Sequence, residues 1–160
     1  MGKLKILVTG AAGFLGSHLC ENLQNLQHKV IGIDNMIGGN LDNIPKNLKF
    51  YNIDCCDFKK LNKIMKNVNV VYHCAATAHE GLSVFSPVEN TKNNYLATVS
   101  VITAGINNKV NRIIYCSSMA RYGNQKTPFT EDMDTSPVDP YGISKVAGEQ
   151  VLKSLCDLNN

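Results

Sequence analysis

The sequence predicts an α/β protein built around a doubly wound parallel sheet. Short apolar runs rich in β-branched residues alternate with longer stretches of helical periodicity, and no repeat or low-complexity segment interrupts them. Five of the runs are almost continuously apolar, which is typical of parallel strands covered on both faces. The predicted strands are residues 5–9, 29–34, 48–53, 68–74 and 112–117.

Four further stretches carry apolar residues at three- and four-residue steps, which is the period of an amphipathic helix. The predicted helices are residues 13–26, 58–66, 87–107 and 141–158. Pro87 suits the first turn of its helix, and Pro140 directly precedes the last helix. Strands and helices alternating in this order predict βαβ units.

The composition predicts one domain, residues 1–160, in a cytoplasmic protein. A chain of 160 residues with 44% hydrophobic residues can bury one sizeable core. The formal charge of +3 is scattered along the chain, so neither nucleic acid nor a membrane surface is an expected partner. No apolar run approaches the ~20 residues that span a bilayer. The six cysteines lack metal-type spacing, so we expect reduced core thiols and no metal site.

A glycine-rich loop follows the first predicted strand and opens the first helix. Gly10, Gly13 and Gly16 let the backbone approach a pyrophosphate, and the helix start stabilises its charge. A glycine-rich turn without a ligand is the alternative. The loop residues predicted to bind a dinucleotide are Gly10, Ala12, Gly13, Phe14, Leu15 and Gly16.

Asp34 ends the second predicted strand, with Asn35 beside it, at the distance typical of a ribose-binding carboxylate. A carboxylate accepts hydrogen bonds from the adenosine ribose hydroxyls and repels a 2′-phosphate. The sequence therefore favours NAD over NADP, with a solvated turn aspartate as the alternative.

Further motifs follow in order: His73-Cys74-Ala75-Ala76, Asn94, Cys116-Ser117-Ser118-Met119-Ala120-Arg121-Tyr122-Gly123 and Tyr141-Gly142-Ile143-Ser144-Lys145. Together with the glycine loop, they resemble the NAD-dependent epimerase/dehydratase family of extended short-chain dehydrogenases/reductases. The resemblance covers nearly the whole chain. It implies a Rossmann-like sheet with strand order 3-2-1-4-5 and an enzyme that uses NAD.

The resemblance implies that Ser118, Tyr141 and Lys145 are the catalytic residues. Tyr141 and Lys145 are four residues apart, so they share one face of a predicted helix. A tyrosine pKa is ordinarily near ~10, and a nearby ammonium is expected to lower it. In the family the tyrosine acts as acid/base on a sugar hydroxyl, the serine binds that hydroxyl, and the lysine also binds the nicotinamide ribose.

The resemblance also implies further cofactor-binding positions. Asp54 would bind the adenine edge with Cys55 beside it, and Asn94 would hold its helix against the catalytic strand or touch the cofactor. The positions expected to line the cofactor at the fourth strand are Cys74, Ala75 and Ala76. Residues expected to have no role in binding or catalysis are His73, packed at a strand end, and Tyr122, a structural side chain. His79 and Glu80 are expected in a loop that edges the substrate site.

The family contains epimerases, reductases, dehydrogenases and dehydratases. Members that dehydrate or decarboxylate typically place an acidic residue soon after the catalytic Ser or Thr, whereas this chain has Met119-Ala120-Arg121. This difference favours a nucleotide-sugar epimerase, with a UDP-sugar as the expected substrate. A nucleotide-sugar reductase, dehydrogenase or dehydratase stays open as an alternative.

The family continues beyond the last helix with a further strand and a C-terminal substrate lobe, which is absent from this sequence. A non-catalytic NAD-binding module is therefore the second alternative, and turnover by this chain alone is not expected unless such a lobe follows. Helices 87–107 and 141–158 correspond to helices that pair across a dimer axis in the family, so a homodimer is expected.

Overall fold

The structure is a computed structural model that describes residues 2–158. The chain divides into two compact units, each described by itself. We call Met1–Ala76 with Ser100–Cys116 the sheet unit, and Thr77–Val99 with Ser117–Asn160 the helical unit. The expectation of one domain stays a prediction.

Strands and helices alternate through the chain as predicted. The elements are β1 (Lys5–Thr9), α1 (Phe14–Asn25), β2 (Lys29–Asp34), the 3-10 turn η1 (Leu41–Asn43), β3 (Lys49–Asn52), α2 (Phe58–Ile64), β4 (Val70–His73), α3 (Glu80–Ser83), α4 (Pro87–Asn90), the π-helical η2 (Thr91–Leu96), α5 (Ala97–Asn107), β5 (Arg112–Tyr115), the 3-10 turn η3 (Met119–Tyr122) and α6 (Pro140–Leu158).

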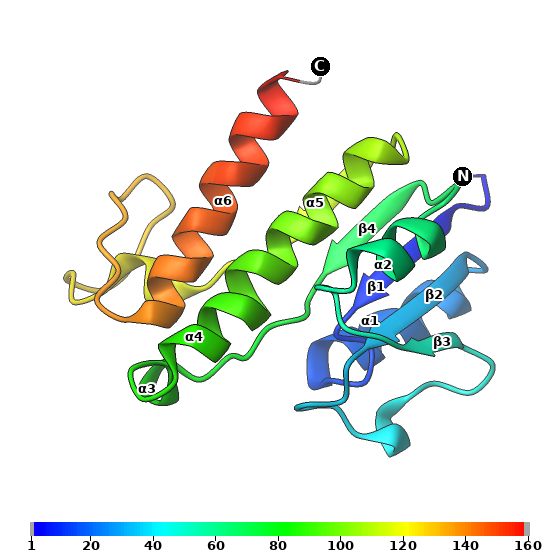
Figure 1. Cartoon of the computed structure of the whole chain (residues 1–160), viewed down its shortest axis with the longest axis horizontal. Helices are drawn as coiled ribbons and strands as arrows, with labels where there is room; N and C mark the ends of the chain where they lie inside the picture. Colours follow the sequence, from blue (N-terminus) through cyan, green and yellow to red (C-terminus); the bar gives the residue numbers. More distant parts are fainter. Residues whose placement is uncertain (1, 159–160) are drawn as a thin grey trace. The chain divides into compact units, whose positions relative to one another are not determined.

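The sheet unit holds a five-stranded sheet in the order β3-β2-β1-β4-β5, with every neighbouring pair parallel (Figure 1). The predicted fold class and strand order are confirmed. The order reverses between β1 and β4, because the chain runs outward through β2 and β3 before it returns to the other side of β1. In open parallel sheets, ligands bind beyond the carboxyl ends of the strands at such a reversal.

Alternating side chains of the strands cover the two faces of the sheet. On one face, Ile6, Val8 and Val30 pack with Cys20 and Leu23 of α1. On the other face, a Cβ at Gly105 of α5 would lie 2.7 Å from Ile113 Cδ1 and 3.8 Å from Met65 Sδ. Both faces are therefore covered in the sheet unit, which explains the continuously apolar strands.

The helical unit is centred on α6. Pro140 is the first residue of this helix, one position before the predicted start, where a proline suits the unpaired first turn. A Cβ at Gly142 would lie 2.7 Å from the Ala120 carbonyl oxygen, so the glycine lets α6 approach η3 closely. The segment around Ser118 is thereby held against the first turn of α6.

The predicted helix 87–107 differs from the structure. Its span contains three consecutive pieces, α4, the π-helical η2 and α5, which run on as one helix in Figure 1. The apolar periodicity did not reveal the π segment, because one wider turn shifts the pattern without interrupting it. π turns are frequent at functional sites, and Asn94 lies in this one.

Some strand ends and cysteines also differ from the predictions. Strands predicted at 48–53, 68–74 and 112–117 are shorter by two or three residues. Cys20 and Cys55 are buried and Cys56, Cys74 and Cys116 are half-buried, but Cys156 is exposed on α6. The prediction of a core thiol is therefore wrong for Cys156, since its helix face is not covered in the part of the chain described.

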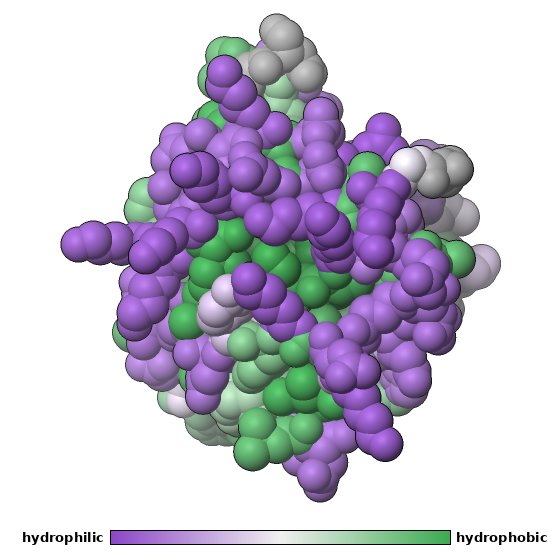
Figure 2. All heavy atoms as spheres, turned by 90° about the vertical axis from the view of Figure 1, so that its right-hand side faces the viewer, coloured by the Kyte–Doolittle hydropathy of each residue, from purple (hydrophilic) through white to green (hydrophobic). Residues whose placement is uncertain are grey.

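The surface carries apolar side chains as well as polar ones. In the view of Figure 2, hydrophobic atoms form a patch bordered by hydrophilic side chains. Within residues 2–158, no helix combines the length and the apolar character needed to cross a membrane.

Candidate functional site

The glycine loop has the close packing that its sequence predicts. Gly10 has a φ of +69°, and a Cβ there would lie 2.8 Å from the backbone nitrogen of Ala75. A Cβ at Gly16 would lie 2.1 Å from the Gly10 carbonyl oxygen, so the first turn of α1 packs directly on the loop. Gly13 is the N-cap residue of α1 and has no side chain to cap it. The N–H groups of that first turn are therefore directed at the space before the helix.

Asp34 is buried at the carboxyl end of β2 and supports the same loop. Its Oδ2 accepts the N–H of Ala12 at 3.0 Å, and its Oδ1 accepts the N–H of Met36 at 2.8 Å. A carboxylate has about four acceptor positions, so two backbone bonds leave capacity for ribose hydroxyls. Asn35 accepts the N–H of Ile37, which shapes the turn after Asp34.

The segment after β2 contacts the glycine loop in a way that the sequence did not predict. The Ala12 carbonyl oxygen accepts the N–H of Asn40 and the side-chain amide of Asn43, each at 3.0 Å. These bonds hold the segment over Ala12. The contact joins residues about 30 positions apart, so no local pattern indicates it.

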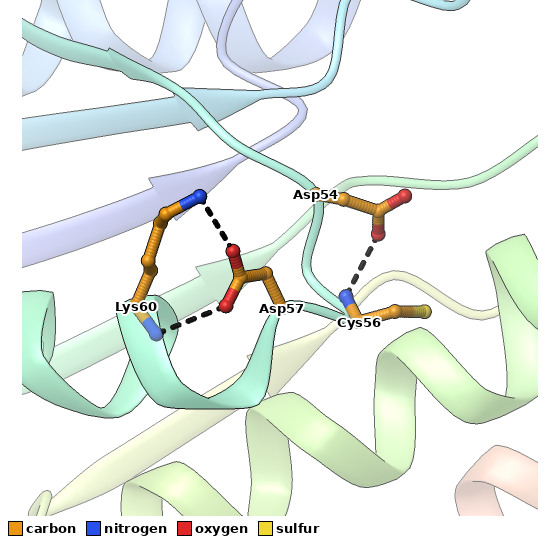
Figure 3. Close-up of polar contacts among 4 residues, drawn as sticks. All are labelled: Asp54, Cys56, Asp57 and Lys60. Atoms are coloured by element: carbon orange, nitrogen blue, oxygen red, sulfur yellow. Dashed lines mark hydrogen bonds and ion pairs between the residues drawn. The ribbon is translucent and has the colours of Figure 1, made fainter.

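Asp54 and Cys55 follow β3 beside the end of β2, where Ile53 N–H donates to the Asp34 carbonyl. Asp54 Oδ1 accepts the N–H of Cys56 at 2.7 Å, as drawn in Figure 3. In the same view, Asp57 caps α2 by accepting the N–H of Lys60, and it also pairs with the Lys60 ammonium at 2.7 Å.

Cys55 is buried, and burial raises the pKa of its thiol to about 12, with Asp54 adding to the effect. A thiol with such a pKa stays protonated at neutral pH. Cys55 can therefore only pack against a ligand and cannot act on one chemically.

The end of β4 is fixed to β1 by a buried polar chain. Thr9 Oγ1 lies 2.7 Å from His73 Nδ1 and accepts the N–H of Ala75 at 3.0 Å. His73 is 1% exposed and stacks on Tyr115, which confirms the prediction of a packed strand-end residue. The bond to Thr9 holds the backbone that leads into Ala76 directly beneath Gly10.

The helical unit brings the three predicted catalytic residues together. Ser118 lies at the start of η3 and hydrogen-bonds the Tyr141 side chain. Lys145 lies one turn further along α6, with Nζ 5.7 Å from the centroid of the Tyr141 ring. Tyr141 and Lys145 are 6% and 3% exposed, so the phenol and the ammonium share a space largely protected from water.

The pKa of Tyr141 differs in direction from the prediction. Burial raises it above its ordinary value, the hydrogen bond from Ser118 acts in the opposite sense, and the charges of Glu80 and Asp139 raise it further. The prediction that an ammonium lowers this pKa is therefore wrong for the chain alone. Desolvation disfavours the phenolate, and two carboxylates add to that effect.

Asn94 holds the segment that follows β4 within the helical unit. Its Oδ1 accepts the N–H of Thr77 at 2.8 Å, while its Nδ2 donates to the Thr77 carbonyl and to Asn90 Oδ1. Asn90 in turn donates to Ser144 Oγ on α6 at 3.1 Å. These contacts give Asn94 a structural role, but they join its helix to the segment around Thr77 and not to the catalytic strand, so both alternatives stay predictions.

Glu149 belongs to the helical unit's network, although the sequence analysis did not single it out. It accepts a hydrogen bond from Ser117 Oγ and lies 3.3 Å from Arg121 Nη2. Its position four residues after Lys145, on the same helix face, is the signal that could have indicated it. Glu149 thus ties both sides of Ser118 to α6.

The prediction for Tyr122 is confirmed, whereas the prediction of a loop at Glu80 is wrong. Tyr122 is buried and stacks on Phe129 at a centroid distance of 4.9 Å, which confirms its structural role. Glu80 begins the short helix α3, not a loop, and His79 is its N-cap residue. Ser83 of that helix accepts the N–H of Tyr141, so α3 supports the start of α6.

The fold and the glycine loop define a dinucleotide-binding α/β protein, and its helical unit holds Ser118, Tyr141 and Lys145. A model of the NAD dependent epimerase/dehydratase family matches residues 6–160. The chain belongs to the NAD dependent epimerase/dehydratase family, and its members use the cofactor predicted from Asp34. The predicted resemblance is therefore confirmed.

Among its relatives, the chain is 38% identical to a putative UDP-glucose 4-epimerase of Methanocaldococcus jannaschii, over 92% of this chain and 50% of that protein. The UDP-glucose 4-epimerase of Thermotoga maritima, solved with UDP-glucose, superposes with a TM-score of 0.94 at 30% identity, covering 98% of this chain and 52% of that one. The Thermus thermophilus UDP-glucose 4-epimerase, solved with NAD, superposes with a TM-score of 0.92 at 30% sequence identity. The match covers 98% of this chain and 52% of that one. The chain spans about half the length of the relatives it matches.

Proposed function

We propose that the chain forms the NAD-binding, proton-transferring half of a nucleotide-sugar 4-epimerase. The observation that carries the proposal is the grouping of buried Tyr141 and Lys145 on one face of α6, with Lys145 Nζ 5.7 Å from the centroid of the Tyr141 ring, in the unit that also holds Ser118. Such a grouping suits the removal and return of a proton at a sugar hydroxyl.

In the sheet unit, we assign NAD binding to residues at the carboxyl ends of β1 to β4. The loop from Gly10 to Gly16 would hold the pyrophosphate, because its glycines let backbone N–H groups approach and the start of α1 favours negative charge. Asp34 would bind the adenosine ribose. The remaining positions proposed to line the cofactor are Asn35, Asp54, Cys55, Cys74, Ala75 and Ala76 in this unit, and Asn94, Tyr141 and Lys145 in the helical unit.

NAD, when bound, supplies a hydride acceptor next to the sugar carbon. Tyr141 Oη would take the proton of the sugar hydroxyl as that carbon becomes a ketone, and would return it to the same oxygen when the alcohol forms again with inverted configuration. Ser118 would hold the same hydroxyl oxygen, and the Lys145 ammonium would stabilise the tyrosinate. In the chain alone, burial and two carboxylates raise the pKa of Tyr141. Lys145 therefore has to offset the free energy by which they disfavour the tyrosinate.

The residues after Ser118 favour epimerisation over dehydration. Met119 and Ala120 carry no carboxylate, and Arg121 is paired with Glu149. The three residues that directly follow Ser118 therefore supply no second acid or base for the removal of water. A reductase or dehydrogenase would use the same three residues, and a non-catalytic NAD-binding module would use the sheet unit alone.

The substrate proposed is a UDP-sugar, because the Thermotoga maritima relative was solved with UDP-glucose. We also propose a homodimer through the helices within residues 87–107 and 141–158. Tyr95 of η2 and five residues of α6 line a surface hollow of about 340 Å³ that could receive side chains of a second copy. Light scattering at rising concentration tests the dimer.

Two experiments test the proposed function. Calorimetric titration of the 160-residue chain with NAD tests cofactor binding. A chimera in which this chain replaces the matching half of the Thermotoga maritima enzyme tests turnover, followed as conversion of UDP-glucose to UDP-galactose. Turnover that is lost in Tyr141→Phe supports the epimerase, with a fall of ~10²–10⁴-fold expected. A folded, NAD-binding chimera without turnover would favour the non-catalytic module.

A further inference from the structure

Two cysteine thiols meet at the carboxyl ends of β4 and β5. Cys74 follows β4 and Cys116 follows β5, and their Sγ atoms lie 3.6 Å apart. Both side chains are half-buried, so a small solute can reach the pair from water. From the sequence, all six cysteines were expected to be packed thiols, Cys74 was also expected to line the cofactor, and no role was expected for the two thiols as a pair.

The sheet register explains why the two sulfurs meet. His73 pairs with Tyr115 in the parallel ladder, and the Cys116 N–H donates to the His73 carbonyl at 3.1 Å. The next pair in this register is Cys74 with Cys116, and paired residues point to the same face of a sheet. Neighbouring strands are ~4.8 Å apart, which lies within the Cα separation of ~4.4–6.8 Å that disulfides span.

From this geometry we infer that Cys74 and Cys116 form a reversible disulfide when the chain meets a hydroperoxide. A disulfide bond is ~2.05 Å long, so the two sulfurs have to approach by ~1.5 Å from their present 3.6 Å. Rotation of two short side chains and a small adjustment of the edge strand β5 suffice for such a movement. The pair is a site of oxidative modification that leaves the strand ladder in place.

The chemistry balances with hydrogen peroxide as the oxidant. One thiolate attacks the peroxide, so an S–O bond forms, the O–O bond breaks, and hydroxide leaves to become water. The second thiol attacks the resulting sulfenic sulfur, so the S–S bond forms, the S–O bond breaks, and a second water leaves with the remaining proton. Two thiols and one peroxide give one disulfide and two waters.

The position of the pair gives the bond a structural consequence. Ala75, directly after Cys74, donates its N–H to Thr9 Oγ1 and lies against Gly10. A movement of Cys74 toward β5 is therefore passed to the backbone beneath the glycine loop. Exposed or strained disulfides are the readily reduced ones, so a dithiol should reverse the change.

Tryptic mapping tests the inference, because trypsin places the two cysteines in separate peptides. Cleavage after Lys66, Lys92, Arg112 and Arg121 gives residues 67–92 and 113–121, each with one cysteine. The native 160-residue chain is treated with hydrogen peroxide, blocked with N-ethylmaleimide and digested without reductant. We expect the two peptides to be linked within one chain, and the link to disappear after dithiothreitol. Met119 sulfoxide in the second peptide adds one oxygen and does not affect the link.

Matched variants give the test its controls. Cys74→Ser and Cys116→Ser should each abolish the link, whereas Cys156→Ser, which removes the exposed cysteine, should leave it unchanged. In denaturant, the oxidised Cys156→Ser chain should have lost two of its remaining thiols. Sulfinic acid without a link, or links that involve only Cys55, Cys56 or Cys156, would overturn the inference. If a serine variant fails to fold, Cys74→Ala and Cys116→Ala replace it.

Discussion

Asp34 combines two tasks in one side chain, since it holds the loop backbone and is proposed to select the cofactor. Both oxygens accept backbone N–H groups, from Ala12 and Met36. We expect Asp34→Ala to narrow the preference for NAD over NADP, because it removes ribose acceptors and a charge that repels a 2′-phosphate. Hydrogen bonds to charged groups contribute ~1.5–3 kcal/mol, so a change of about tenfold or more is expected in titrations with both cofactors.

Asp34→Asn separates the two tasks. Asparagine keeps one oxygen acceptor and loses the charge. NADP binding should therefore improve relative to NAD while the chain keeps more stability than Asp34→Ala. An unchanged cofactor preference in both variants would remove Asp34 from the proposed site.

Tyr141 is expected to make stability depend on pH in the alkaline range. Its pKa is raised in the folded chain, first by burial. A raised pKa gives stability that is complete below the unfolded value of about 10 and is lost as pH rises through the folded pKa. Relative to Tyr141→Phe, the chain should therefore lose free energy of unfolding above about pH 10 in urea titrations.

Two neighbours of Tyr141 set where this loss occurs. Ser118 lowers the folded pKa and Glu80 raises it, so Ser118→Ala should extend the loss to higher pH and make it larger, whereas Glu80→Gln should end it at lower pH and make it smaller. Shifts in the same direction for both variants would contradict the electrostatic account. The comparison depends on the position of the pH transition, so a constant loss of stability does not disturb it.

Among the elements, the start of α1 makes a close backbone contact with the glycine loop. A Cβ at Gly16 would lie 2.1 Å from the Gly10 carbonyl oxygen and 2.7 Å from its carbon. Because these are backbone atoms, Gly16→Ala should displace the loop, destabilise the fold by ~1–3 kcal/mol and weaken NAD binding. Urea unfolding and calorimetry measure the two effects.

Gly81→Ala is the control for this prediction. A Cβ at Gly81 meets nothing within 4 Å, and the residue lies in the short helix α3. Alanine favours a helix over glycine by up to ~1 kcal/mol, so this variant should be neutral or slightly more stable. If Gly16→Ala and Gly81→Ala lost the same free energy of unfolding, the contact with Gly10 would not be the cause of the destabilisation.

The sequence predicted the elements and site residues that are indicated by residues close together in the chain. The glycines, Asp34 and the Tyr141–Lys145 spacing follow from short motifs, and the strands follow from apolar runs. Glu149, the Thr9–His73 bond and the cover of Ala12 by Asn40 depend on contacts across many residues, which a local pattern does not contain. The direction of the Tyr141 pKa could not be predicted, because it depends on burial and on Glu80 from another helix.

At the scale of the whole molecule, cofactor binding and folding should be linked. A ligand that binds only the folded chain adds RT ln(1 + [L]/Kd) to its stability, or ~2.7 kcal/mol at one hundred times Kd. We expect NAD to raise the thermal unfolding midpoint steadily with the logarithm of its concentration, and NADP to do so less. Nicotinamide mononucleotide, which lacks the adenosine that Asp34 is proposed to bind, is the control and should have little effect. No NAD-dependent rise would contradict binding in the sheet unit.

The π turn at Thr91–Leu96 has a consequence for insertions and deletions in this chain. An α-helix advances ~100° per residue, and the wider turn holds one residue more than an α turn would. Before it, Asn90 meets Ser144; after it, Ala97 and Thr98 of the same unit are buried. Deleting one residue here would leave an unbroken helix of ordinary composition, yet it would rotate one of these two faces away from its neighbours. The segment should therefore tolerate substitution of its exposed side chains far better than any change in its length.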